Sequence, residues 1–473
     1  MSLRSPQRGA LPRLTEVDAF SRTMAHGWEP MNTPLAMVPG AAQAAARHRQ
    51  ILSDALGAND AVVFAGEAPI RNDDCFYAFR PNSTFAWLTG CALEFAVIVL
   101  KARPGGHDAT LFATPPARPD ERDFFASPAH GELWVGPSPG LAEVGQATGL
   151  AVRPLSDLDQ AIGGLGSALF GGGLPPDLAA RRSQLLEEAS STARMIKDEW
   201  EIGQLREAIA ATVRGFEAVA AALPDAIAIP RGERWLQATF DRTARTLGNG
   251  PGYASIVGSG AHAPILHWVR CDGQIDPHAP LLLDMGVEAQ SLYTADVTRT
   301  IPPSGTFSPA ARQVHDLVEA AHRAGLAAAT VGADYLGFHF AAMEVIAQGL
   351  KDWGVLEVSV DEALSPGGQQ HRRYIVCGIG HHLGLDVHDC SRAERRRYEE
   401  AALAPGMVFT VEPGLYFHAN DLTVPPELRG IGVRIEDDLL ILPDGGAEVL
   451  SADLPIDASG LEDWTGSLLR APR

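Results

Sequence analysis

The stretch LLLDMGVEAQSLYTADVTRT, residues 281–300, contains the pattern that decides the fold of the C-terminal part of the chain. An apolar run ends at Asp284, the chain turns at Gly286, and a second strand carries Asp296. We expect a hairpin whose two carboxylates point into one cavity. Buried side by side without a cation, they would repel each other, and at least one would take up a proton. A divalent metal ion removes this penalty, so the hairpin predicts a metal site if other segments supply further ligands.

A second stretch repeats this plan. FTVEPG, residues 409–414, has the same order of apolar residues, acid and glycine as LLLDMG, and RIEDD follows it as TADVTRT follows the first. YASIVGSG (residues 253–260) and YIVCGIG (residues 374–380) also resemble each other. This internal similarity predicts two similar halves, each contributing an acidic hairpin to a shared centre. We expect strands in residues 253–260, 371–380, 407–416 and 431–442, with a helix starting at Ser308 between them.

Composition limits the class of protein. The 473 residues exceed one compact core, so two or more domains are expected. With 46% hydrophobic and 20% charged residues, the chain is typical of soluble globular proteins. A net charge of -20 argues against nucleic acids and anionic membranes as partners. Five scattered cysteines, without a C-x-x-C pair or an N-terminal apolar segment, predict a cytoplasmic location.

The order of segments predicts a mixed α/β (α+β) fold with two domains. Residues 1–40 are rich in proline and arginine and suggest an irregular lead-in. A helical pattern follows at residues 41–57, and strand patterns follow at residues 61–67, 94–102 and 109–115. GGGLPP, residues 171–176, is a break, and long helices are expected after it. We therefore expect an N-terminal domain with a linker helix over residues 1–190 and a second domain over residues 191–473.

Four carboxylates and one imidazole on the strand-like segments of the second domain predict a metal site. They are Asp284, Asp296, His381, Glu412 and Glu436, with His267 and His388 nearby. An oxygen-rich set suits manganese, cobalt, iron or zinc, and four carboxylates suit two ions because a carboxylate can bridge. Such a pair can generate a hydroxide at neutral pH and polarise a carbonyl, which is hydrolase chemistry. Each residue alone has a simpler explanation in turn formation, core packing or ion pairing. The interpretation depends on their occurring together on apolar strands.

At this point the motifs resemble a known family. LLLDMG with TADVTRT, GIGHHLGLDVHD, VEPGLY and GVRIEDD resemble the pita-bread metallopeptidases. YASIVGSGAHAPILHW and RGIGVRIEDDLLI resemble aminopeptidase P (Xaa-Pro aminopeptidase) in particular, and RNDDCFYAFRPNSTFAWLTG resembles its N-terminal domain. The resemblance covers roughly residues 45–455. It implies a creatinase-like α/β domain followed by a pita-bread catalytic domain with pseudo-twofold-related halves.

The resemblance also implies a role for each matching ligand. Asp296 and Glu436 would bridge two divalent ions, Asp284 would bind one ion, and His381 and Glu412 the other. The implied metal is Mn²⁺, with Co²⁺ or Zn²⁺ as alternatives. A hydroxide bridging the ions would attack the scissile carbonyl, with Glu412 as general base and proton shuttle.

Further residues match positions around the substrate in this family. His267 and His388 would bind substrate and stabilise the tetrahedral intermediate. Arg434 would orient the ligands, with Tyr416 beside it. Substrate entrance positions on the N-terminal domain, of the same or a neighbouring subunit, match Asp74 and Trp134. Arg194 matches, less securely, a family arginine near that entrance. The implied partners are peptides with proline in the second position and further copies of this chain, as a dimer or tetramer.

The sequence departs from the family in the loop between Asp284 and Asp296, which is one residue longer than usual, and at two further places. The family often has a histidine four residues before His381, where this chain has Cys377. The family also has a substrate-side arginine near Arg395, Arg396 and Arg397, but none of the three aligns uniquely, and a solvated charged helix explains them equally well.

The expected activity is release of an N-terminal residue that precedes proline. A prolidase, which cleaves only Xaa-Pro dipeptides, shares all five ligands and is the main alternative. A metal-free creatinase-type amidinohydrolase would not keep the carboxylate ligands. An inactive pita-bread module that binds other proteins is a further alternative, although such modules generally lose ligands.

Overall fold

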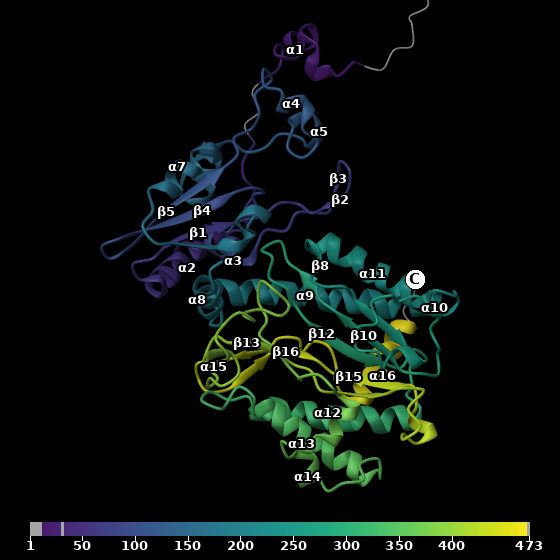
Figure 1. The fold of residues 1–473 in the computed structure, drawn as a ribbon. Helices are drawn as coiled ribbons and strands as arrows, with labels where there is room; N and C mark the ends of the chain where they lie inside the picture. Colours follow the sequence, from purple (N-terminus) through teal and green to yellow (C-terminus); the bar gives the residue numbers. More distant parts are fainter. Residues whose placement is uncertain (1–11, 30–32, 471–473) are drawn as a thin grey trace, which may run out of the picture. The chain divides into compact units, whose positions relative to one another are not determined.

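The computed structural model describes residues 12–29 and 33–470 and divides the chain into two compact units (Figure 1). Unit 1 is Met1–Leu186 and unit 2 is Glu187–Arg473. Both combine helices with sheets, so the predicted mixed α/β class is confirmed. Within the described ranges, no helix has the length and apolar character needed to cross a membrane.

Unit 1 is built on a five-stranded sheet in the order β6-β5-β4-β1-β7. Strand β4 runs antiparallel to β1 and β5, whereas β6 and β7 run parallel to their neighbours. Val62, Phe64, Val99 and Phe170 belong to one buried cluster on this sheet. The strands are β1 (Asp60–Phe64), β4 (Val97–Arg103), β5 (Gly106–Ala113), β6 (Ala151–Pro154) and β7 (Ala168–Gly172), with a separate hairpin of β2 (Ile70–Asn72) and β3 (Cys75–Phe76). The helices include α2 (Ala41–Leu56), α3 (Ser83–Thr89), α4 (Asp123–Ala126), α5 (Glu132–Val135), α6 (Leu141–Thr148) and α7 (Leu158–Gly163).

The predicted irregular lead-in is wrong at residues 14–24, whereas residues 33–38 are irregular as expected. A short 3-10 helix, Leu14–Glu16, precedes α1 (Asp18–Met24). Asp18 in the first turn and Arg22 in the last turn of α1 complement the helix dipole, a local effect that proline and arginine content does not reveal. Residues 1–11 and 30–32, which the same prediction covers, lie outside the described residues.

The predicted hairpin of residues 281–300 is confirmed in unit 2. Strand β10 (Leu281–Met285) pairs antiparallel with β12 (Val297–Ile301), and Asp284 lies opposite Thr298. Strand β9 (Ile256–Ser259) pairs with the other edge of β10. The turn requires Gly286, because a Cβ there would lie 1.8 Å from the carbonyl oxygen of Ala295.

The second half of unit 2 repeats this arrangement. Strand β13 (Val408–Val411) pairs antiparallel with β16 (Asp437–Ile441), which also pairs with β17 (Ala447–Val449). Each half has a two-stranded ribbon as well, β8 (Gly250–Pro251) with β11 (Val287–Glu288), and β14 (Gly414–Phe417) with β15 (Ile431–Arg434). An isolated bridge between Thr298 and Glu436 joins the halves, so the two acidic hairpins meet.

Helices cover the strands of unit 2 (Figure 1). Helix α9 (Glu199–Ala221) packs on β11, and α11 (Gly232–Leu247) packs on β8 and β9. Helix α12 (Pro309–Ala328) packs on β13, β14 and β15, with α13 (Gly337–Asp352) beside it. The remaining helices are α8 (Gln184–Arg194), which crosses the division between the units, α10 (Leu223–Ile227), α14 (Val360–Leu364), α15 (Arg395–Tyr398) and α16 (Ala458–Leu469).

The strand predicted over residues 371–380 is wrong. A 3-10 helix, Gln370–Tyr374, is followed by irregular chain. The guanidinium of Arg372 donates to the carbonyl oxygens of Ile375, Val376 and Cys377, and it thereby occupies acceptors that a strand would use. The chain joins β13 and the residue after it only from Ile379 onwards, where the amide of Glu412 donates to the carbonyl of Ile379 and the amide of Thr410 to that of His381, both at 2.9 Å.

Candidate metal centre

A cavity of about 620 Å³ lies in unit 2, and all five predicted metal ligands line it. The two acidic hairpins contribute the four carboxylates, and the chain that joins β13 contributes the imidazole. Both predicted substrate-binding histidines also line the cavity. The lining includes Asp284, Asp296, His381, Glu412, Glu436, His267, His388, Arg434, Cys377 and Tyr253.

The first hairpin places two buried carboxylates on the cavity. Asp284 accepts a 2.6 Å hydrogen bond from the Tyr253 hydroxyl and is paired with Arg434. Burial raises the pKa of Asp284, and the neighbouring Asp296 adds to this, although Arg434 opposes them. The amide of Asp296 donates to Asp438 Oδ2 at 3.1 Å, which fixes the backbone at the start of β12.

The second half contributes two further acids. Glu412 follows β13, and burial raises its pKa to about 7, with His381 and Arg434 lowering it and the two hairpin aspartates raising it. Glu436 lies between β15 and β16 and accepts a 2.7 Å hydrogen bond from the Thr298 hydroxyl. Burial, and then Asp296 among its neighbours, raises the pKa of Glu436 well above its usual value. These buried carboxyl groups are so close together that they can all be ionised only if cations lie beside them.

His381 completes the set. Its Nε2 lies 3.3 Å from Asp296 Oδ2 and 3.4 Å from Glu412 Oε1. Its Nδ1 lies 3.2 Å from the carbonyl oxygen of His382, and this oxygen can only accept, so Nδ1 donates and Nε2 faces the acids. Burial lowers the pKa of His381, but Asp296 and Glu412 outweigh burial and raise the pKa to about 9. The neighbouring His382 points instead into the core, where its ring stacks on Tyr335 at 4.7 Å.

Arg434 connects Asp284 and Glu436 through a network of polar contacts. It contacts Asp284, its Nε donates to the Thr298 hydroxyl at 3.0 Å, and its Nη1 donates to the Tyr416 hydroxyl at 3.0 Å. Thr298 in turn donates to Glu436. The predicted ligand-orienting arginine and Tyr416 thus belong to one buried network that restrains two of the acids.

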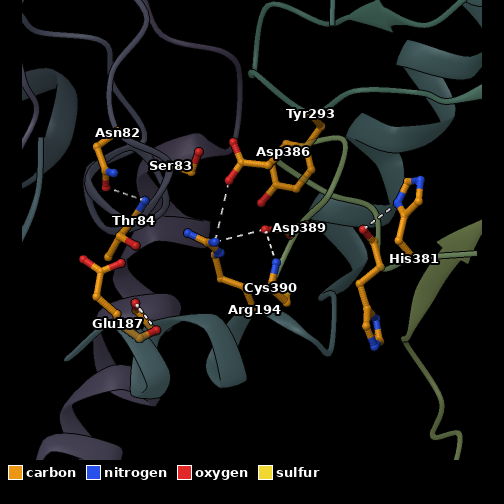
Figure 2. A network of polar contacts seen from close by, with 12 residues as sticks. Asn82, Ser83, Thr84, Glu187, Arg194, Tyr293, His381, Asp386, Asp389 and Cys390 are labelled. Carbon is orange, nitrogen blue, oxygen red and sulfur yellow. Dashed lines mark hydrogen bonds and ion pairs between the residues drawn. The ribbon is translucent and has the colours of Figure 1, made fainter. Parts of the chain in front are cut away.

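His388 and His381 lie at the two ends of one loop, with ring centroids 4.4 Å apart. Figure 2 shows the anchor of this loop, where Arg194 points towards Asp386 and Asp389. Asp389 is buried, 3.0 Å from Arg194 and 3.3 Å from the ammonium of Lys197. Burial raises the pKa of Asp389, but the two cations outweigh burial and lower it. Arg194, matched in sequence to an entrance position, therefore holds the segment that follows His388.

Other predicted residues have different surroundings. Trp134 is 57% exposed in unit 1, with its indole donating to the carbonyl of Phe125, and Asp74 lies in the exposed turn between β2 and β3. Of the described residues that line the cavity, none is Arg395, Arg396 or Arg397. Arg395 pairs with Glu399 one turn along α15 at 2.8 Å, as expected of a solvated helix.

Sequence reasoning missed Tyr253 and Thr298. Thr298 lies two residues after Asp296 and therefore on the same face of the strand, which is a pattern that could have identified it. Tyr253 precedes β9, and only its contact across the sheet with Asp284 reveals its place. Cys377 lines the cavity, so the position where the family often has a histidine does face the site.

The donor set fits metal ions. Ligand atoms of Asp296, His381 and Glu436 all lie within 4.8 Å of one another, and Asp284 and Glu412 line the same cavity. Burial raises the pKa values of Asp284, Glu412 and Glu436, and an imidazole nitrogen faces the acids, which is an arrangement that a divalent cation stabilises. The fold and the site define a metal-dependent hydrolase with an oxygen-rich centre.

Comparison with known proteins agrees with this class. The model of metallopeptidase family M24 matches residues 203–443, and the aminopeptidase P N-terminal domain model matches residues 45–168. The chain is 45% identical to Xaa-Pro aminopeptidase 2 of Streptomyces coelicolor over 461 residues, 95% of this chain and 96% of the relative. It belongs to metallopeptidase family M24, in the group of Xaa-Pro aminopeptidases.

Solved structures are similar over nearly the whole chain. The low-pH form of Escherichia coli aminopeptidase P matches with a TM-score of 0.79 at 26% identity, covering 91% of this chain and 99% of that one. A zinc-substituted form of the same enzyme in complex with product matches with a TM-score of 0.78 at 27% identity, covering 92% and 99%. The resemblance to aminopeptidase P drawn from the sequence motifs is therefore confirmed.

Proposed function

We propose that this enzyme releases the N-terminal residue of peptides that have proline in the second position. The observation that carries the proposal is the convergence of four carboxylates and one imidazole on a single cavity of unit 2. The relatives named Xaa-Pro aminopeptidase, similar over 95% of the chain, support this substrate class over a dipeptidase.

Two divalent ions would be held by Asp284, Asp296, His381, Glu412 and Glu436. Asp296 and Glu436 would contact both ions, and Mn²⁺ suits the oxygen-rich set best, with Co²⁺ or Zn²⁺ as alternatives. When bound, the ions activate water at neutral pH and polarise the scissile carbonyl.

The chain's own groups then move protons and orient the substrate. Glu412 would take a proton from the attacking water and deliver it to the leaving amine. His267 and His388, which both line the cavity, would donate to the substrate carbonyl as it becomes tetrahedral. Arg434, braced by Tyr416, keeps Asp284 in place.

Unit 1 contributes the substrate entrance in this proposal. Asp74 would attract the free α-ammonium of the peptide, and Trp134 would supply an apolar wall, in the same or a neighbouring subunit of a dimer or tetramer. We place the N-terminal domain at residues 1–190 and the catalytic domain at residues 191–473. The five cysteines are all free thiols, which supports a reducing cytoplasm as the location.

A peptide series with metal add-back tests the proposal. The chelated enzyme receives Mn²⁺, Co²⁺ or Zn²⁺ and is assayed on an Xaa-Pro dipeptide, Xaa-Pro-Yaa tripeptides and longer peptides, with Xaa-Ala-Yaa as the matched control. We expect metal-dependent hydrolysis of the tripeptides and longer peptides and little hydrolysis of the control. Hydrolysis of the dipeptide alone would identify a prolidase, and absence of both bound metal and hydrolysis would identify a binding module.

A further inference from the structure

A buried carboxylate outside the metal centre holds a whole loop. Glu233 of α11 has no solvent exposure, and three N–H donors and one imidazole nitrogen converge on it. Its Oε1 lies 2.9 Å from the amide of Ser259 and 2.7 Å from His262 Nδ1. Its Oε2 lies 2.8 Å from the indole nitrogen of Trp268 and 2.7 Å from the amide of Gly273. Oε2 accepts from both of its partners, and Oε1 accepts from the Ser259 amide and lies within hydrogen-bond distance of the imidazole.

The four hydrogen-bond partners all belong to one segment, residues 259–273, which begins in β9 and leads towards β10. This segment carries His267, and its neighbours Leu266 and Val269 also line the cavity. Trp268 directly follows His267 and is buried. Holding the Trp268 indole on Glu233 therefore restrains the backbone from which the His267 ring projects.

Packing around the carboxylate strengthens this restraint. The His262 and Trp268 rings are stacked with centroids 3.8 Å apart, and the Arg270 guanidinium lies 4.2 Å from the Trp268 ring centroid. Gly273 reaches the carboxylate only because it lacks a side chain, since a Cβ there would lie 2.8 Å from Glu233 Oε2. Residues 259–273 therefore pack closely around the carboxyl group of Glu233.

We propose that Glu233 is a positioning residue that fixes His267 for its contact with the substrate. The inference rests on the function proposed above for His267. Glutamine does not reproduce these contacts, because its NH2 group would face at least one backbone or indole N–H donor and leave that donor unpaired. The loop would then loosen and the imidazole would lose its place at the cavity.

A double-mutant cycle tests this role. We compare Glu233→Gln, His267→Ala and the double variant, as full-length metal-loaded enzyme on an Xaa-Pro-Yaa peptide. Glu233→Gln should lower kcat/KM by about 10- to 100-fold, the size expected from a misplaced catalytic group. In the His267→Ala background it should cost no more than about 3-fold, because residues that act through one another are not additive. Bound metal, measured directly, should equal that of the wild type.

Two further variants serve as a matched control and as a milder change at the same carboxyl group. Glu288→Gln changes another buried acid of the same half, which accepts from Asn249 at 2.9 Å outside this loop, and its effect should be the same in both backgrounds. Trp268→Phe removes only the indole donor and should give a smaller loss that also vanishes with His267→Ala. It replaces Glu233→Gln if that variant does not fold.

The outcomes separate this inference from the proposed function. Wild-type activity in His267→Ala would refute the role given to the histidine itself. If His267→Ala loses activity but Glu233→Gln costs the same in both backgrounds, or lowers the bound metal, Glu233 does not act through His267 and the inference is overturned.

Discussion

Removing the metal ions should make the stability of this protein fall as pH rises, which is the reverse of the usual acid denaturation. Burial raises the pKa of Glu412 from its usual 4.5 to about 7 in the folded protein. The folded state therefore holds this proton more tightly than the unfolded state, and it loses that advantage as pH rises from 4.5 to about 7. Each pH unit between the two pKa values corresponds to about 1.4 kcal/mol. The loss of the Glu412 proton over this pH range therefore lowers the free energy of unfolding by about 3 kcal/mol.

His381 acts in the same direction at higher pH. Its pKa is raised from 6.5 to about 9, mainly by Asp296 and Glu412 acting against burial. A raised histidine pKa contributes stability that is complete below 6.5 and is lost as pH rises through about 9. Metal-free protein should therefore lose stability continuously between about pH 5 and about pH 9. Below that range, acids with lowered pKa values, such as Asp389, begin to lose their ion pairs.

Urea unfolding of chelated enzyme at several pH values measures this trend. A parallel series with saturating Mn²⁺ should show the opposite slope over the same range, because metal binds deprotonated ligands and stabilises the folded state. Glu412→Gln should flatten the metal-free curve between about pH 5 and about pH 7. Metal-free stability that is constant or increasing up to pH 8 would refute the reasoning that the acids are crowded at one point.

Three substitutions test other parts of the site. Thr298→Val removes the hydroxyl that donates to Glu436 and should lower metal affinity by about 10- to 100-fold, measured by competition with a chelator. Thr298→Ser keeps a hydroxyl and should bind metal as the wild type does. Equal metal affinities of Thr298→Val and the wild type would contradict the account. Cys377→His adds a donor to the cavity and should lower KM for Xaa-Pro-Yaa peptides by about 2- to 10-fold, with Cys377→Ser as the control; an unchanged KM would show that the position does not reach the substrate. Lys197→Met leaves Asp389 buried with one cation fewer and should lower the free energy of unfolding by about 3 kcal/mol in urea; an unchanged value would show that Arg194 suffices.

The sequence predicts the hairpins and the ligand set because burying an acid in an apolar strand costs free energy. An acid at such a position therefore indicates a binding role. Asp284 in a five-residue buried strand is such a case. The strand expected near Tyr374 is absent because Arg372 occupies the neighbouring carbonyls, a tertiary effect that strand propensity does not include. Glu233 was missed for a related reason, since its nearest donor lies 26 residues away along the chain.

Prediction is weaker for groups that act through others. Tyr253 and Thr298 have no charge, and their partners Asp284 and Glu436 lie 31 and 138 residues away along the chain, so these contacts follow only from the tertiary fold. Lys197 and Asp389 lie 192 residues apart in the sequence and meet because the chain folds back on itself. Pairing at such distances is determined by topology and not by local pattern.

The central claim is that two divalent ions occupy one cavity of unit 2 and that activity requires both. The most direct measurement is a Mn²⁺ titration of chelated enzyme, in which bound manganese per chain and hydrolysis of an Xaa-Pro-Yaa peptide are recorded on the same samples. We predict that binding saturates at two ions per chain for the wild type, that activity rises with that occupancy, and that Glu436→Gln loses both. Full hydrolysis by the metal-free enzyme, or normal two-ion binding by Glu436→Gln, would contradict the account.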